Sequence, residues 1–104
     1  MKQIKAFIRP ECLDEVEDAL QLIEGLPGLA ITRVAGYGRG KSGVRELQEK
    51  VELQTVVHDD LVEMVISTIQ KSAHTGNMGD GKIFIANIED ALRIRTGERG
   101  ESAI

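Results

Sequence analysis

Hydrophobic and polar residues alternate along several short segments of the chain. Residues 2–9 alternate in this way and are rich in strand-forming side chains, as expected for a β-strand buried on one face. Pro10 should end this strand, because proline has no backbone N–H to donate to a sheet. The same reasoning predicts further strands over residues 30–37, 51–57 and 82–86, and a short fifth one over 92–95.

Two other segments carry apolar residues at the spacing of an amphipathic helix. The apolar positions of the first are Leu13, Val16, Leu20 and Ile23. Asp14 and Glu15 lie in its first turn, where the helix dipole favours anions, and glycine and proline within 25–28 end it. The apolar positions of the second are Leu61, Val62, Val65, Ile66 and Ile69. Asp59 or Asp60 is predicted to cap its start.

The predicted elements follow the order β-α-β twice, and the second half echoes the first. Two interleaved β-α-β units give the ferredoxin-like α+β fold, in which two helices cover one face of a four-stranded antiparallel sheet. We therefore expect residues 1–104 to form a single domain. The aromatic residues are only Phe7, Tyr37 and Phe84, so the strands are mainly aliphatic. A subunit interface is the expected cover for the second face of such a sheet.

Composition narrows the class of protein. A domain of 104 residues has a modest core, and chains of this size often gain stability from oligomerisation. The single cysteine, Cys12, excludes an internal disulfide and a CxxC motif. The first residues lead into a strand pattern rather than a signal peptide, and no apolar run approaches membrane-spanning length. We expect a cytoplasmic protein without direct membrane insertion.

The charge is unevenly distributed. The net charge of −4 argues against a general nucleic-acid-binding protein. Residues 10–32 contain six acidic side chains and no basic one, whereas residues 33–50 contain five basic and two acidic ones. Local basic loops on an acidic protein suit a small anionic ligand, although ordinary solvated loop charge would give the same pattern.

A glycine-rich turn with a lysine is the strongest chemical signal. Gly79-Asp80-Gly81-Lys82 opens the fourth strand, and Arg93 and Arg95 follow at strand spacing. Glycines let backbone N–H groups approach an anion, while Lys and Arg neutralise its charge. These features predict a polyphosphate site, and we expect the two segments to meet in space.

Other motifs carry less weight. Residues 38–43 match GxGxxG, and Gly40-Lys41-Ser42 resembles the end of a P-loop, but both motifs need a helix to follow and a strand is predicted instead. His58 and His74 have no partners at metal-ligand spacing, and Cys12 has no general base near it in sequence. Thus no metal or catalytic residue is assigned, and Asp80 is expected to form an Asx turn.

Taken together, these segments resemble the PII signal-transduction proteins. The resemblance rests on Arg9-Pro10 followed by Leu13-Asp14-Glu15-Val16, on Gly36-Tyr37-Gly38-Arg39, on Thr75-Gly76 with Gly79 to Phe84, and on Arg93 to Glu98 with the terminal Ala103-Ile104. It implies a homotrimer of ferredoxin-like subunits with ATP or ADP in the three clefts between neighbours. Loop 38–50 corresponds to the family's T-loop, 75–82 to its B-loop and 93–104 to its C-terminal loop.

The resemblance also implies roles for individual residues. On the phosphate side of the cleft it implies Thr75, Gly79, Asp80, Gly81 and Lys82, with Arg93 and Arg95 reaching in from the adjacent subunit. Beside the nucleotide it implies Gly36, Tyr37, Gly38 and Arg39, and near the base Val56. Lys and Arg would bond the β- and γ-phosphates, so discrimination between ATP and ADP would rest on the last phosphate.

The chain departs from the family pattern in its middle loop. That loop is several residues shorter and lacks a tyrosine for modification, since Tyr37 takes the family's Phe position. Gly40 replaces the glutamine that helps to hold Mg²⁺ and 2-oxoglutarate, while the lysine that pairs with 2-oxoglutarate is kept as Lys50. Ala30 replaces an adenine-contacting threonine. Binding of Mg²⁺ and 2-oxoglutarate is therefore left open.

The leading hypothesis is a non-enzymatic, trimeric nucleotide sensor. ATP or ADP would control the loop over residues 38–50, which would engage a membrane transporter or a metabolic enzyme, in nitrogen or related metabolism. The alternatives are a small phosphate-processing enzyme on the same fold, as in acylphosphatases, and a regulatory module that binds another small molecule.

Overall fold

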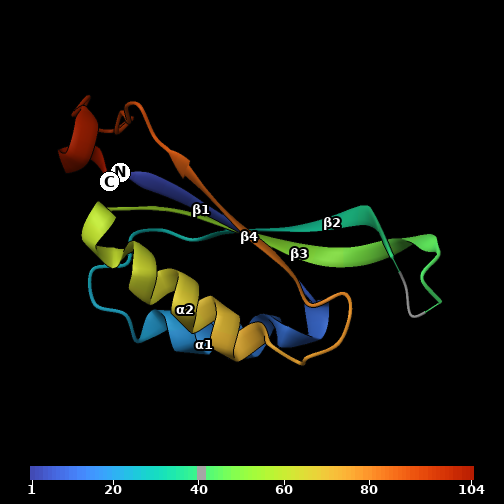
Figure 1. Cartoon of the computed structure of the whole chain (residues 1–104). Helices are drawn as coiled ribbons and strands as arrows, with labels where there is room; N and C mark the ends of the chain where they lie inside the picture. The colour runs from blue at the N-terminus through green and yellow to red at the C-terminus, as the bar shows by residue number, and fades with distance from the viewer. Residues whose placement is uncertain (40–41) are drawn as a thin grey trace.

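The computed structural model describes residues 1–39 and 42–104. Within them, four strands form one antiparallel sheet in the order β2-β3-β1-β4 (Figure 1). The strands are β1 (Lys2–Ile8), β2 (Ala30–Arg39), β3 (Arg45–Val57) and β4 (Gly81–Asn87). Helices α1 (Leu13–Gln21) and α2 (Val62–Ala73) lie side by side on one face of the sheet. Three short 3₁₀ turns complete the fold: η1 (Pro10–Cys12), η2 (Asp59–Leu61) and η3 (Gly100–Ala103).

The core lies between the helices and the sheet. Strand β1 pairs with both β3 and β4, so that Ile4 stands opposite Thr55 on one side and Ile85 on the other. Alternate strand residues face the helices, and the largest fully buried side chains are Ile4, Ile8, Leu20, Leu53, Val16, Val51, Val57 and Val65. Each such aliphatic side chain contributes about 1.5–3 kcal/mol by leaving water. The alternation and the helical spacing read from the sequence therefore build the predicted ferredoxin-like arrangement.

The opposite face of the sheet carries polar side chains and two phenylalanines. Phe7 and Phe84 meet edge to face, with ring centroids 6.2 Å apart. The side chain of Phe84 remains 53% exposed. Such exposure is consistent with the expectation that a further copy covers this face.

Strand β3 is longer than the sequence pattern predicts. It starts at Arg45 rather than at residue 51, and its pairing with β2 continues out to Arg39 opposite Arg45. The predicted flexible loop over 38–43 is therefore wrong at Gly38 and Arg39, which lie in β2; Gly40 and Lys41 lie outside the described residues. The sequence pattern does not predict this extension, because beyond the helices neither face of the hairpin is buried and its residues do not alternate between apolar and polar.

Two smaller predictions are corrected. Asp59 and Asp60 do not cap α2: they lie in η2, and the helix begins without a side-chain cap. The predicted fifth strand is an isolated bridge between Leu92 and Arg99, because Gly97 donates its N–H to the Arg93 carbonyl (2.7 Å) and closes a tight turn. No helix in the described part of the chain is long and apolar enough to cross a membrane.

Candidate functional site

A cleft of about 820 Å³ opens between the β2–β3 hairpin and the turn that precedes β4. Its lining residues are Phe7, Val34, Ala35, Gly36, Tyr37, Gly38, Arg39, Gln48, Lys50, Asn77, Met78, Gly79, Asp80, Gly81, Lys82 and Phe84. Eight of the twelve residues predicted to bind nucleotide thus lie around one cleft: Gly36, Tyr37, Gly38, Arg39, Gly79, Asp80, Gly81 and Lys82.

Glycine is required where the turn meets the sheet. Gly81 has φ +105°, a backbone conformation that side chains rarely adopt. A Cβ atom on Gly81 would lie 1.7 Å from the carbonyl oxygen of Phe7. Gly79 has φ +100°, so its backbone conformation also favours glycine. The glycines of the motif therefore let the turn close against the end of β1.

Asp80 organises this turn rather than pointing its carboxylate at a ligand. Its Oδ2 accepts hydrogen bonds from the backbone N–H groups of Thr75 (2.8 Å) and Gly76 (2.9 Å). Its Oδ1 accepts from the Thr75 hydroxyl and from Nε of Arg9 (3.1 Å). The Thr75 contacts first, and then Arg9, hold the pKa of Asp80 well below its usual range. The expected Asx turn, in which the carboxylate accepts from an N–H two residues on, is therefore wrong: Asp80 instead accepts from N–H groups four and five residues before it and is committed to them.

Two cations brace the same turn. Arg9 donates to the Met78 carbonyl (2.7 Å), and the ammonium group of Lys50 donates to the Gly79 carbonyl. Burial, and then the nearby Arg9, lower the pKa of Lys50. An anion in the cleft would oppose this lowering, because a nearby negative charge stabilises the charged ammonium group.

The charge of the cleft is positive. Arg39, Lys50 and Lys82 line it and Arg9 supports it, against the one acidic lining residue, Asp80. Such a group of cations beside a glycine turn can hold an anionic ligand of several charges. Sequence reasoning missed Arg9 as part of this site. The signal that places it is the strand register, which sets Ile8 opposite Gly81 and so brings the next residue beside Asp80.

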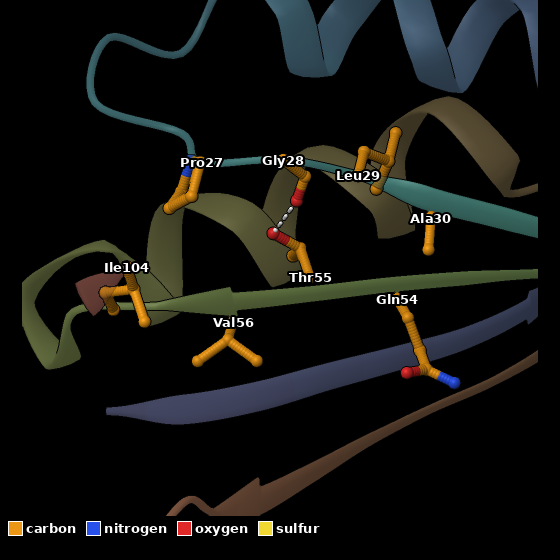
Figure 2. A pocket seen from close by; sticks show the side chains of 8 residues that line it. All are labelled: Pro27, Gly28, Leu29, Ala30, Gln54, Thr55, Val56 and Ile104. Carbon is orange, nitrogen blue, oxygen red and sulfur yellow. Dashed lines mark hydrogen bonds between the residues drawn. The ribbon is translucent and has the colours of Figure 1, made fainter. Parts of the chain in front are cut away.

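Two of the remaining predicted residues lie elsewhere. Thr75 does not line the cleft, and its hydroxyl donates to the carboxylate of Asp80. Val56 lines a second cavity of about 480 Å³, on another part of the sheet (Figure 2). The other lining residues of that cavity are Pro27, Gly28, Leu29, Ala30, Gln54, Thr55 and Ile104. The hydroxyl of Thr55 donates to the Gly28 carbonyl (2.9 Å) and closes one side of it.

Arg93 and Arg95 are separated from the glycine turn by the length of β4. They follow the end of that seven-residue strand, whereas Gly81 begins it, and at about 3.3 Å per residue the strand spans roughly 20 Å. Figure 1 shows the two segments at opposite ends of β4. The expectation that they meet in space is therefore wrong within one chain. Arg93 instead pairs with Glu98 (3.2 Å) inside its own turn.

The described residues hold no group of three or more His, Cys, Asp and Glu side chains that could bind a metal. His58 contacts Glu101 across a 2.5 Å hydrogen bond. Cys12 is buried, and that burial raises the pKa of its thiol, which disfavours the reactive thiolate.

Comparison with known proteins gives a consistent match over nearly the whole chain. The family model described as nitrogen regulatory protein P-II matches residues 1–98. Proteins named nitrogen regulatory protein P-II from Bradyrhizobium diazoefficiens and Rhodospirillum rubrum are 47% and 48% identical to this chain, with all of each chain covered. The protein named nitrogen regulatory protein P-II 2 from Methanothermobacter thermautotrophicus is 44% identical and is covered over 97% of its length.

Proposed function

The chain belongs to the nitrogen regulatory protein P-II family, and on this basis we propose that it is a homotrimeric signal-transduction protein that binds ATP or ADP. Its relatives are named as regulatory proteins, in line with a regulator rather than an enzyme. The cytoplasm, where both nucleotides are available, is the proposed site of action.

The separation of the two cationic segments is the observation that carries this proposal. The cleft of one chain has Lys82 and a glycine turn, while Arg93 and Arg95 lie beyond the far end of β4. A second copy packed on the open sheet face would bring its arginines to the cleft of the first. Cyclic symmetry then repeats the composite site, which explains why both halves are kept on one small chain.

The chemistry of the cleft suits a polyphosphate. The ammonium group of Lys82 and the guanidinium groups of the neighbouring copy would form charge-assisted hydrogen bonds with phosphate oxygens. Backbone N–H groups at the glycine turn would add uncharged donors. Val56, near Ala30 in the second cavity, is the proposed neighbour of the base.

Signalling would pass from the glycine turn to the hairpin. Lys50 of β3 donates to the Gly79 carbonyl, so a phosphate that attracts Lys50 competes with this contact. The hairpin tip beyond Lys50 would then change its preferred position, and a partner transporter or metabolic enzyme would respond. Pairing of 2-oxoglutarate with the ammonium group of Lys50 is a further part of the proposal.

Calorimetric titration with ATP and ADP tests the binding step. We expect Lys82→Ala and Arg95→Ala each to weaken ATP binding at least tenfold, the size of one charge-assisted contact to phosphate. Lys71→Ala, on the exposed side of α2, is the control and should bind as the unaltered protein does. Absence of nucleotide binding by the unaltered protein would overturn the proposal.

Mixed trimers test whether the site is shared between copies. Lys82→Ala and Arg95→Ala chains are refolded together, so that some clefts receive an intact turn from one chain and an intact arginine from the other. We expect these mixtures to recover tight ATP binding that neither variant has alone. A site made within one chain would show no recovery.

A phosphate-release assay separates the regulator from the phosphate-processing enzyme. The regulator should bind ATP without turning it over at an enzyme-like rate. Steady phosphate release that Lys82→Ala abolishes would favour the enzyme instead.

A further inference from the structure

The C-terminal segment, residues 90–104, has few polar links to the rest of the protein. In the described parts of the chain, every hydrogen bond and ion pair that joins this segment to earlier residues ends on Glu101. One apolar contact adds to them, since Ile104 lines the cavity that also holds Val56 and Pro27 (Figure 2).

Within itself the segment is well connected. The guanidinium group of Arg99 donates to Asp90 Oδ2 through Nε (2.8 Å), and Gly100 donates its N–H to Asp90 Oδ1 (3.1 Å) and to the Ala91 carbonyl (2.9 Å). Arg93 donates its N–H to the Glu98 carbonyl (2.9 Å). These bonds link the segment into one unit, so its placement on the sheet sets the placement of Arg93 and Arg95.

Glu101 has two partners at the sheet end. Its Oε2 lies 2.5 Å from Nδ1 of His58, and its Oε1 accepts from the α-ammonium group of Met1 (3.2 Å). His58 and Met1 lie at the same end of two paired strands, just after β3 and just before β1. Because its two carboxylate oxygens bind two different groups, the orientation of the Glu101 side chain is restricted more than one contact would restrict it. These contacts, His58 first, hold the pKa of Glu101 below its usual range, so that it stays ionised near neutral pH.

We propose that Glu101 is a positioning residue for nucleotide binding, and that its contacts with His58 and Met1 hold the arginine-bearing segment in the orientation that the neighbouring subunit's cleft needs. The inference rests on the proposed nucleotide site. It assigns to Glu101 no contact with the ligand: the effect passes through Arg93 and Arg95. Geometry that is set before the ligand arrives lowers the ordering cost of binding.

A double-mutant cycle on the full-length protein tests this route. We expect Glu101→Gln to weaken ATP binding about three- to tenfold, the scale of one or two partly exposed ion pairs. In an Arg95→Ala background the same change should weaken binding by a smaller factor, because one of the two groups that Glu101 positions is already gone. Equal effects in both backgrounds would overturn the proposal.

Two variants separate positioning from a general loss of charge or structure. Glu89→Gln removes the same charge just before the segment and should leave ATP affinity unchanged. His58→Asn keeps an N–H donor near the position of Nδ1 and should bind ATP within about twofold of the unaltered protein, whereas His58→Ala should resemble Glu101→Gln. If Asn and Ala at position 58 behave alike, His58 does not hold Glu101.

Hydrogen exchange on the nucleotide-free protein reports on the contact itself. Glu101→Gln should speed exchange at Ile88, whose N–H donates to the Met1 carbonyl where the segment leaves the sheet. Exchange at Arg93, Gly97 and Gly100 should be unchanged, because their N–H groups donate within the segment. If hydrogen exchange in Glu101→Gln is the same as in the unaltered protein, the inference is overturned even if ATP binds normally. If the unaltered protein does not bind ATP but Glu101→Gln changes exchange as expected, the proposed function is overturned and the contact made by Glu101 is still supported.

Discussion

The two ends of β4 carry cationic segments that are held in opposite ways. At its start, the glycine turn is fixed by Asp80, Arg9 and Lys50, and its backbone touches β1. After its end, the arginine turn is ordered internally but joins the rest of the described chain through Glu101 and Ile104. The difference indicates a division of work. In the proposed trimer, the braced turn would keep backbone donors in place, and the separately attached segment would bring its arginines to a neighbouring copy.

The largest expected effect comes from a side chain at the rigid end. Gly81→Ala places Cβ against the Phe7 carbonyl in a left-handed backbone, so we expect a loss of about 3 kcal/mol or more in unfolding free energy. Gly97→Ala is the matched change in the arginine turn. Its φ is +76° but no atom lies within 4 Å, so strain alone should cost about 1 kcal/mol. Chemical denaturation measures both, and equal losses would remove the contrast between the ends.

A smaller effect is expected from the carboxylate that organises the turn. Asp80→Asn removes charged acceptance from Thr75, Gly76 and Arg9, so the protein should be less stable at neutral pH. Because the folded-state pKa of Asp80 is lowered, its stabilisation is present above the unfolded carboxyl pKa of about 4 and is lost as the pH falls through the lower folded value.

Urea unfolding of both proteins across pH measures this loss. The gap in stability between unaltered protein and Asp80→Asn should be full at pH 7 and shrink below about pH 4. The other carboxylates titrate in both proteins and cancel in the difference. A gap that does not change with pH would mean that the charge of Asp80 contributes nothing.

The smallest expected effect is a shift in titration without a change in fold. Burial and Arg9 lower the pKa of Lys50 in the nucleotide-free protein, and a bound polyphosphate should raise it, because a nearby anion favours the ammonium form. Lysine side-chain NMR with and without ATP measures the shift. The side-chain resonances of Lys71, which is exposed and away from the cleft, should be the same with and without ATP. An unchanged or lower Lys50 pKa would show that phosphate does not approach this lysine.

Much of the fold was predictable because its signals are local. Alternation in β1 and the helical spacing of Val16, Leu20, Val65 and Ile69 reflect burial on one face, which the sequence records directly. The extension of β3 to Arg45 was not predictable in this way, because its side chains beyond the helices meet no core. The missing cap at Asp59 has a similar origin: its carboxylate contacts Met1 and Lys2, which are distant in sequence.

The sequence by itself determined the two helices and the four strands of the sheet, their order, the glycine turn and the presence of Lys82, Arg93 and Arg95, because spacing and residue type are local properties. Only the tertiary structure decided how these parts combine. Strand register set Gly81 against Phe7 and Arg9 beside Asp80, and the length of β4 kept the arginines away from the lysine. Register and distance arise from pairing between segments far apart in the chain, which no local pattern encodes.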